Sequence, residues 1–273
     1  MSERPRMSLV NFRDPAVLAD PASRLVRHGV LFRSAQPFPA ADEETVALLA
    51  AHGIRTVVDL RGVSEIRDGD WTAAEAAGIE VVQARMEPAN EALAQAMRTM
   101  ATGADLGAFY LLMAESAPEW VAAAVAAAAR PGGVLLHCAA GKDRTGLLIA
   151  LLLDLLGVPT EEITTDYAST AEALPQIFAG LAERNRAVLN DIESGAVTVP
   201  RPLLEAPAEA MAAFLRLVHA RYGGAAGLLA HLGVPAATLE ALRAKTAAAA
   251  APAAGATTPA DATTAPAAGG AAC

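Results

Sequence analysis

Residues 134–146, Val-Leu-Leu-His-Cys-Ala-Ala-Gly-Lys-Asp-Arg-Thr-Gly, decide the fold that we expect for this chain. The apolar run at 134–136 predicts a buried strand, and the leucine-rich run at 147–156 predicts a helix. Cys138 and Arg144 stand at the two ends of the loop between them, with five residues separating them. A strand that passes through a short loop into a helix is the unit from which parallel α/β sheets are built.

A strand-to-helix loop of this kind is an anion site, because backbone N–H groups converge there and the helix dipole favours negative charge. The same field favours the thiolate of Cys138, which is a nucleophile. Arg144 supplies a planar fork that matches two phosphate oxygens, and its place at a helix start opposes the dipole unless it meets an anion. The spacing therefore indicates phosphoryl transfer through a cysteinyl-phosphate.

The other loop residues support the same interpretation. Gly141 allows a backbone conformation that is closed to other residues, and Gly146 allows a close approach of the following helix. Thr145 suits a helix N-cap. His137 suits a buried hydrogen-bonding support, since a thiolate that has already formed needs no base. The phosphate-binding loop that we expect comprises Ala139, Ala140, Gly141, Lys142, Asp143, Arg144 and Thr145.

Lys142 and Asp143 each allow two roles. The ammonium of Lys142 can hold a second phosphate, as on an inositol ring, or it can tune Cys138 for all substrates alike. The carboxyl of Asp143 can protonate the leaving oxygen, or it can orient Lys142 or Arg144. The catalytic residues that we expect are Cys138 as the nucleophile, Arg144 as the clamp and Asp143 as the acid.

The string from His137 to Gly146 resembles the signature loop of the protein tyrosine and dual-specificity phosphatases. It is most similar to a bacterial branch that acts on phosphotyrosine and, in some members, on phosphoserine/threonine and phosphoinositides. The resemblance extends over residues 10–246. It is carried by further landmarks of that branch, which are Leu31-Phe32-Arg33-Ser34, Val57-Val58-Asp59-Leu60-Arg61 with Glu65, Asp166-Tyr167 and Arg221-Tyr222-Gly223.

This resemblance implies a three-layer α/β domain with a mostly parallel central sheet and a helical C-terminal elaboration. It implies a phosphomonoester hydrolase that works through a phosphocysteine, with Arg33, Asp59 and His137 in support and the Thr145 hydroxyl bonded to the sulfur. The partners would be phosphorylated proteins or phosphoinositides. We expect no cofactor and no metal, and no Cys/His spacing suggests zinc.

The general acid is less clear than the nucleophile. Many tyrosine phosphatases carry an acidic residue on a mobile loop after an earlier strand. The equivalent stretch here, 83–90, has no aspartate and only Glu87, so Glu87 is the reserve behind Asp143. Asp59 ends a predicted strand at the edge where ligands bind. A structural ion pair of Asp59 with Arg33 or Arg61 is the stronger interpretation.

Other enzyme classes fit the loop less well. A Walker A loop needs glycine and Ser/Thr where this chain has Leu136 and Asp143. Rhodanese-like sulfurtransferases and arsenate reductases also place a cysteine beside an anion loop, but the Arg-Thr-Gly ending and the preceding histidine favour a phosphatase. An inactive phosphate-binding module is the alternative from another class, and it is disfavoured because Cys138 and Arg144 are both intact.

Composition excludes some partners. The formal net charge of −9 argues against a nucleic-acid binder. The two cysteines, Cys138 and Cys273, form no disulfide framework and fit a reducing compartment. The first ten residues lack an apolar signal core, and no apolar run reaches the ~20 residues of a membrane span. We expect a cytoplasmic protein, with export without a cleaved signal as the alternative, and the sequence does not specify the oligomeric state.

The pattern of elements predicts one phosphatase domain over 11–246, between a loose N-terminus at 1–10 and a disordered Ala/Pro/Thr-rich tail at 247–273. Strands are predicted over 30–32, 54–60, 79–84 and 134–137. Helices are predicted over 42–52, 70–77, 91–115 (interrupted near Gly103 and Gly107), 118–130 and 147–156. Further helices are predicted over 160–170, 174–193, 207–222, 225–232 and 235–246. A lid is expected within about 160–220.

Overall fold

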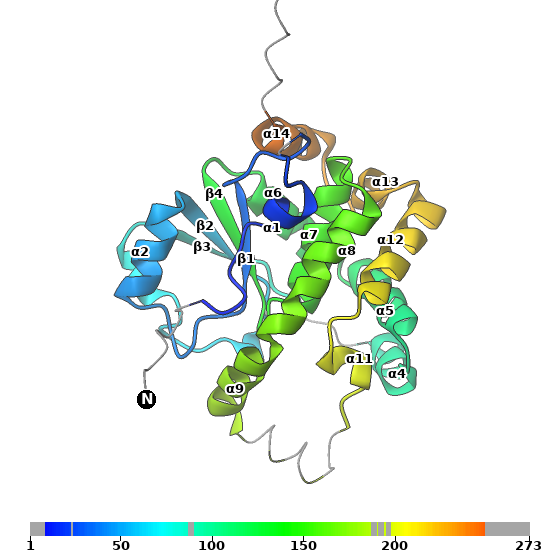
Figure 1. The fold of residues 1–273 in the computed structure, drawn as a ribbon, viewed down its shortest axis with the longest axis horizontal. Helices are drawn as coiled ribbons and strands as arrows, with labels where there is room; N and C mark the ends of the chain where they lie inside the picture. Colours follow the sequence, from blue (N-terminus) through cyan, green and yellow to red (C-terminus); the bar gives the residue numbers. More distant parts are fainter. Residues whose placement is uncertain are drawn as a thin grey trace, which may run out of the picture.

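The computed structural model describes residues 9–22, 24–86, 90–186, 190, 194 and 198–248. Its centre is a four-stranded sheet in which all pairings are parallel and the strand order is β1-β4-β2-β3 (Figure 1). The strands are β1 (Leu31–Ser34), β2 (Ile54–Asp59), β3 (Glu80–Gln83) and β4 (Gly133–His137). The expected α/β class with a parallel sheet is confirmed.

Helices cover both faces of this sheet, which makes three layers (Figure 1). One face carries α2 (Glu43–Ala51) and α3 (Thr72–Ala76). The other face carries a larger group: α1 (Pro15–Ala19), α4 (Glu91–Thr99), α5 (Gly103–Ser116), α6 (Pro118–Ala128), α7 (Asp143–Leu155), α8 (Thr160–Ala168), α12 (Ala208–Tyr222), α13 (Ala225–His231) and α14 (Ala236–Thr246). The remaining described helices are η1 (Val63–Glu65), η2 (Ser169–Ala173), α9 (Leu174–Arg184) and α11 (Arg201–Leu204).

The strands divide their side chains between two hydrophobic clusters, as the twofold repeat of a buried strand requires. Phe32 and Leu135 pack with α2 and α3. Their chain neighbours Leu31, Val134 and Leu136 pack with the helices of the larger group. The sheet is therefore buried on both sides, and only its edges and strand ends are left for a site.

The predicted helix over 91–115 is two helices. Thr102 caps α5 through a hydrogen bond between its hydroxyl and the backbone N–H of Asp105, which separates α5 from α4. The expected break at Gly103 is correct, but the one at Gly107 is wrong. Gly107 lies inside α5, where a Cβ would stand 2.4 Å from the carbonyl oxygen of Ala210, so its role is the close packing of α5 on α12.

Two helices of the region expected to contain a lid contribute residues to the core. Helix α8 buries Asp166 and Tyr167, and α12 buries Met211 and Phe214. Helix α9 ends at Arg184, and residues 187–189, 191–193 and 195–197 lie outside the described part of the chain.

The ends of the described chain are tied to the domain. Leu9 is fully buried, and the carbonyl of Val10 accepts a hydrogen bond from the N–H of Ala35. At the other end, Ala247 pairs with Val26 in an isolated antiparallel bridge. Residues 1–8 and 249–273, where loose segments are expected, lie outside the described residues.

Among the described residues, no single helix has the length and apolar composition to cross a membrane; α5 and α6 pass that test only as a pair bent by 88°. The same residues contain no group of three or more His, Cys, Asp or Glu side chains that is arranged to hold a metal ion.

Candidate active site

The signature loop emerges from the middle of the sheet. β4 lies between β1 and β2, and its last residue, His137, is in register with Ser34 of β1 and Asp59 of β2. The loop over 138–142 follows at once, and α7 begins at Asp143. Ligands bind to parallel sheets at this carboxyl edge. The predicted order of strand, loop and helix is therefore found, but the helix begins four residues earlier than predicted, so Arg144 lies in its first turn.

Gly141 fixes how the loop lies against the sheet. Its φ is +64°, in the left-handed region, and a Cβ there would stand 2.1 Å from the carbonyl oxygen of Ser34. No other residue fits this place without movement of the β1 backbone. The loop is therefore pressed directly onto the end of β1.

Arg33 holds the loop from beneath. It is fully buried, and one terminal nitrogen donates to the carbonyl of Gly141 at 2.8 Å while the other donates to Asp166. Asp166 also accepts from Nε of Arg13 at 2.7 Å, so two guanidinium groups share one buried carboxylate. Asn11 donates a second bond to the carbonyl of Gly141. Arg33 thus holds the loop in position through Gly141, and Asp166 holds Arg33.

His137 is a neutral support, as its place before the cysteine suggests. Its Nε2 accepts from the indole N–H of Trp71 at 3.1 Å, and its Nδ1–H donates to the carbonyl of Cys138 at 3.2 Å. Full burial lowers the pKa of His137 to about 4, although the nearby Asp59 opposes the shift. The ring is therefore uncharged at neutral pH and has no proton to spare for catalysis.

Asp59 belongs to a buried ion-pair network. Its two oxygens accept from Nε and Nη2 of Arg61 at 2.9 and 2.6 Å. Burial alone would raise the pKa of Asp59, but its electrostatic interactions with His137 and Arg61 and the hydrogen bonds from Arg61 leave that pKa lowered. Arg61 also pairs with Asp70, which pairs in turn with Arg184 at the end of α9. Asp59 is therefore a structural partner of Arg61, not of Arg33, and is poorly suited to donate a proton.

Arg144 is held in place by Glu65. Its Nη1 and Nη2 donate to the two carboxylate oxygens of Glu65 at 2.5 and 2.6 Å, and Nη1 also reaches the carbonyl of Leu60 at 3.2 Å. Burial works to lower the pKa of Arg144, but these bonds, together with the charges of Cys138 and Glu65, leave it raised. The guanidinium is thus charged and fixed, with its remaining N–H groups able to meet a phosphate.

Asp143 ends a chain of hydroxyl groups. Tyr110 of α5 donates to Oδ1 of Asp143 at 2.7 Å, and the hydroxyl of Tyr167 donates to that of Tyr110, also at 2.7 Å. Burial, with the charge of Asp143 next in size, raises the pKa of Tyr110 well above its ordinary value, so this hydroxyl keeps its proton. Lys142 places its ammonium 3.2 Å from the same Oδ1. Oδ2 of Asp143 has no partner among the described residues.

Lys142 does not face the site as expected for a residue that binds a second phosphate. Its side chain is buried, and Nζ donates to the carbonyls of Leu203 at 2.8 Å and Glu205 at 2.5 Å. These carbonyls belong to α11 and to the residue after it. They can accept from Lys142 because the last carbonyls of a helix have no hydrogen-bond partner within it. The ammonium is thus bound to these two carbonyls and to Asp143, and it ties α11 to the loop.

Thr145 is not the N-cap of α7. The helix begins at Asp143, which makes Thr145 the third helical residue, and its hydroxyl is buried without a hydrogen-bond partner among the described residues. A buried hydroxyl without a partner is costly unless something meets it. Cys138, itself only 2 % exposed, lies on the same loop.

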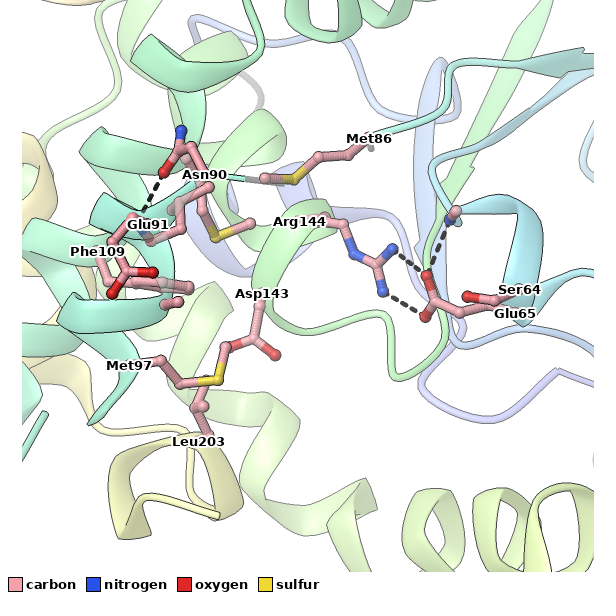
Figure 2. A pocket seen from close by; sticks show the side chains of 14 residues that line it. Ser64, Glu65, Met86, Asn90, Glu91, Met97, Phe109, Asp143, Arg144 and Leu203 are labelled. Carbon is pink, nitrogen blue, oxygen red and sulfur yellow. Dashed lines mark hydrogen bonds and ion pairs between the residues drawn. The ribbon is translucent and has the colours of Figure 1, made fainter. Parts of the chain in front are cut away.

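A cavity of about 810 Å³ opens beside Arg144 and Asp143 (Figure 2). In Figure 2 the guanidinium of Arg144 lies between Glu65 on one side and a group of apolar side chains on the other. The apolar lining consists of Met86, Leu93, Ala94, Met97, Phe109, Met113 and Leu203. The polar lining consists of Gly62, Ser64, Glu65, Asn90, Glu91, Asp143 and Arg144. Glu87, the reserve candidate for the general acid, lies outside the described residues.

The model of the tyrosine phosphatase family matches residues 5–248, nearly the whole described domain. The chain belongs to this family.

Several individual tyrosine phosphatases are similar in sequence to part or most of this chain. A tyrosine-protein phosphatase of Nostoc commune is 38% identical over 119 residues, which are 44% of this chain and 40% of that protein. The triple specificity protein phosphatase PtpB of Mycobacterium tuberculosis is 33% identical over 123 residues, 43% of this chain and 44% of that protein. In both comparisons the match spans less than half the length of the relative.

A longer match is to a protein of Cupriavidus necator that carries a tyrosine-protein phosphatase name, with 34% identity over 79% of this chain and 78% of that protein. Among solved structures, P. aeruginosa TpbA in complex with pTyr matches at a TM-score of 0.31 and 19% identity, covering 85% of this chain and 100% of TpbA.

Sequence reasoning did not single out two residues that shape this site. Trp71 sets the tautomer of His137, and Tyr110 binds the candidate acid. Both come from elements distant in sequence from the loop, so no spacing could identify them. Glu65 was noted in the sequence only as part of the landmark that includes residues 57–61. The structure shows that it forms an ion pair with Arg144.

Proposed function

We propose that the chain hydrolyses phosphomonoesters, phosphotyrosine in proteins first among them, through a phosphocysteine on Cys138. The observation that carries this proposal is the pairing of Glu65 with Arg144, which fixes a charged fork at the loop that also holds Cys138. A fixed donor aimed at developing negative charge is the largest single contribution in many active sites. The family match supports the same reaction class.

In the first step the sulfur of Cys138 attacks phosphorus, and the bond from phosphorus to the ester oxygen breaks. Asp143 gives its proton to that oxygen, so the leaving group departs as a neutral alcohol or phenol. In the second step water attacks the phosphocysteine and passes a proton to the Asp143 carboxylate. The phosphorus–sulfur bond breaks, which releases inorganic phosphate and returns the thiolate.

Asp143 suits this role through its two unequal oxygens. Oδ1 accepts from Tyr110 and lies beside the ammonium of Lys142, whereas Oδ2 has no partner among the described residues. A proton therefore resides more favourably on Oδ2, and the residue lines the cavity next to Arg144. The Thr145 hydroxyl, buried without a partner, can donate to the sulfur as it leaves phosphorus.

Phosphoserine and phosphothreonine enter this proposal as poorer substrates, because their alkoxide leaving groups depend more strongly on the acid. Phosphoinositides are a weaker proposal, since the lysine expected to hold an additional phosphate is bound to the carbonyls of Leu203 and Glu205. A phosphate-binding module without activity is the alternative, and it gives no reason for Cys138 and Arg144 to occur together on one loop.

Steady-state turnover tests the proposal. A phosphotyrosine peptide, a phosphoserine peptide and a soluble phosphoinositide are compared for the unmodified protein, Cys138→Ser and Arg144→Lys. We expect turnover of phosphotyrosine, none in Cys138→Ser with substrate binding retained, and a loss of about 10²–10³ in Arg144→Lys, which cannot grip two oxygens. Binding without turnover by the unmodified protein would support the inactive module.

A further inference from the structure

The cavity beside Arg144 is apolar along most of its wall. Three methionines, Phe109 and two leucines line it, and they come from α4, α5, α11 and the segment after β3 (Figure 2). Met86, Leu93, Phe109 and Met113 are each no more than 7 % exposed, so they form a preformed floor. Met97 is 41 % exposed and stands at the mouth. Methionine side chains adapt to apolar groups of different shape.

The charges around this cavity are unfavourable to a polyanion. Among the described residues that line it, Arg144 is the only cation, whereas Glu65, Glu91 and Asp143 are carboxylates. Arg144 is already paired with Glu65, and the transferred phosphoryl group would use its remaining donors. A second phosphate or an acidic side chain in the cavity would therefore face uncompensated negative charge.

The size of the cavity exceeds what a phosphotyrosine ring needs. A volume of about 810 Å³ lies in the upper part of the ~300–1,000 Å³ range of sites for drug-sized ligands.

The polar groups of the lining suit a peptide backbone. Asn90 uses its carbonyl oxygen to cap α4, which leaves its amide N–H groups free to donate, and Ser64 adds a hydroxyl. A hydrocarbon chain would leave such groups without partners.

We propose that this cavity binds a bulky apolar side chain adjacent to phosphotyrosine in a protein substrate, and that the protein selects such sites over those flanked by acidic residues. The inference rests on the proposed function, because the phosphotyrosine must occupy the neighbouring loop. The floor of Met86, Phe109 and Met113 binds the side chain, and the surrounding carboxylates repel acidic neighbours.

Three phosphotyrosine peptides test the proposal. They differ only in the residue adjacent to the phosphotyrosine, which is phenylalanine, alanine or glutamate. We expect kcat/KM to fall in that order, by about tenfold from phenylalanine to alanine, as loss of an apolar contact in a pocket typically gives. Met97→Ala should lower kcat/KM for the phenylalanine peptide several-fold more than for the alanine peptide. Leu18→Ala is the control, since Leu18 on α1 is similarly exposed (39 %) and lies outside the cavity.

A charge reversal tests the second half of the proposal. Glu91 is exposed and pairs on the surface with Arg98, so Glu91→Lys should leave the fold intact. It should raise kcat/KM for the glutamate peptide several-fold at low salt, and the gain should shrink as salt screens the charges.

Equal kcat/KM for the three peptides would overturn the inference while leaving the proposed function standing. A soluble phosphoinositide turned over faster than the phenylalanine peptide would also overturn it. No turnover of any peptide, or of phenyl phosphate, would instead contradict the proposed function itself.

Discussion

At the scale of single residues, the proposed mechanism assigns the proton transfer to one oxygen atom of Asp143. Asp143→Asn removes the proton donor and should slow aryl phosphates with poor leaving groups by about 10²-fold, with little effect on good ones. Tyr110→Phe removes the bond that orients Oδ1. Tyr110→Phe should lower the rate by a smaller factor, about tenfold, because hydrogen bonds to charged groups are worth ~1.5–3 kcal/mol. This loss should also be greatest for poor leaving groups.

The measurement is kcat/KM across phenyl phosphates of increasing leaving-group pKa. Tyr222→Phe is the matched control, since its hydroxyl bonds Glu115 on the outer side of α5. Equal losses at all leaving groups in Asp143→Asn would make Asp143 a structural residue. An unchanged profile in Tyr110→Phe would separate the tyrosine from the acid.

Sequence alone identifies the residues that can be recognised by their spacing along one short stretch of chain. Cys138, Gly141 and Arg144 lie on one loop, and their types and order indicate an anion site. The direction of a side chain is not written there. Lys142 was expected toward substrate, but the carbonyls that bind it lie some sixty residues further along the chain. Only the fold brings them together.

At the scale of elements, the contact between the loop and β1 predicts a sharp response to one methyl group. Gly141→Ala places a Cβ 2.1 Å from the carbonyl oxygen of Ser34, at a φ of +64°. We expect a loss of roughly 2–5 kcal/mol in the free energy of unfolding, from backbone strain and overpacking together, with loss of turnover. Urea unfolding measures it.

Gly53→Ala provides the control, because Gly53 has a φ of +63° and open space around its Cβ position. It should lose only the strain of the left-handed backbone, ~1–2 kcal/mol. If the two substitutions cost the same, the loop does not press on β1 as described.

Lys142 links the loop to α11, and its removal should loosen that link. Lys142→Met keeps the aliphatic stem but leaves the carbonyls of Leu203 and Glu205 without their donor. Each unpaired group costs ~1–3 kcal/mol, so α11 should open and proteolysis within 198–207 should become faster by at least tenfold. Limited proteolysis with mass spectrometry measures the rate.

Lys245→Met is the comparison, since the ammonium of Lys245 bonds a backbone carbonyl, that of Ala128, far from α11. Cleavage within 198–207 should stay at its original rate in that variant. The same slow rate in Lys142→Met would mean that apolar packing alone holds α11.

The predicted elements match the structure where a local signal marks their ends. Strand β4 begins and ends within one residue of its prediction, and helix α7 ends within one residue of its prediction but begins four residues earlier, at Asp143. Helix α12 lies within the region where a lid is expected, and its packing depends on a distant residue. Gly107 lets α12 approach α5 closely, and Met211, Phe214 and Val218 of α12 are buried. Such packing depends on two distant segments, and no single stretch predicts it.

At the scale of the whole molecule, the buried His137 couples stability to pH. Its pKa falls from 6.5 to about 4 on folding because burial penalises the charged ring. Between those values the unfolded chain binds a proton that the folded chain does not, so the free energy of unfolding decreases as pH falls. By pH 4 the loss from this group should reach about 3 kcal/mol.

Urea unfolding from pH 7 to pH 4.5 measures this dependence in the unmodified protein and in His137→Gln. Glutamine can still accept from Trp71 but cannot titrate, so the variant should be less stable at neutral pH and lose less stability on acidification. Parallel curves for the two proteins would show that His137 does not titrate in this way.

The central claim is that Cys138 becomes covalently phosphorylated, and rapid quenching with labelled substrate tests it most directly. The protein is mixed with an excess of a phosphotyrosine peptide labelled in the phosphoryl group, quenched in acid within milliseconds, digested and mapped. The account predicts label on the peptide containing Cys138 in the unmodified protein, and no label in Cys138→Ser. Label on another residue, or turnover by Cys138→Ser at the unmodified rate, would contradict it.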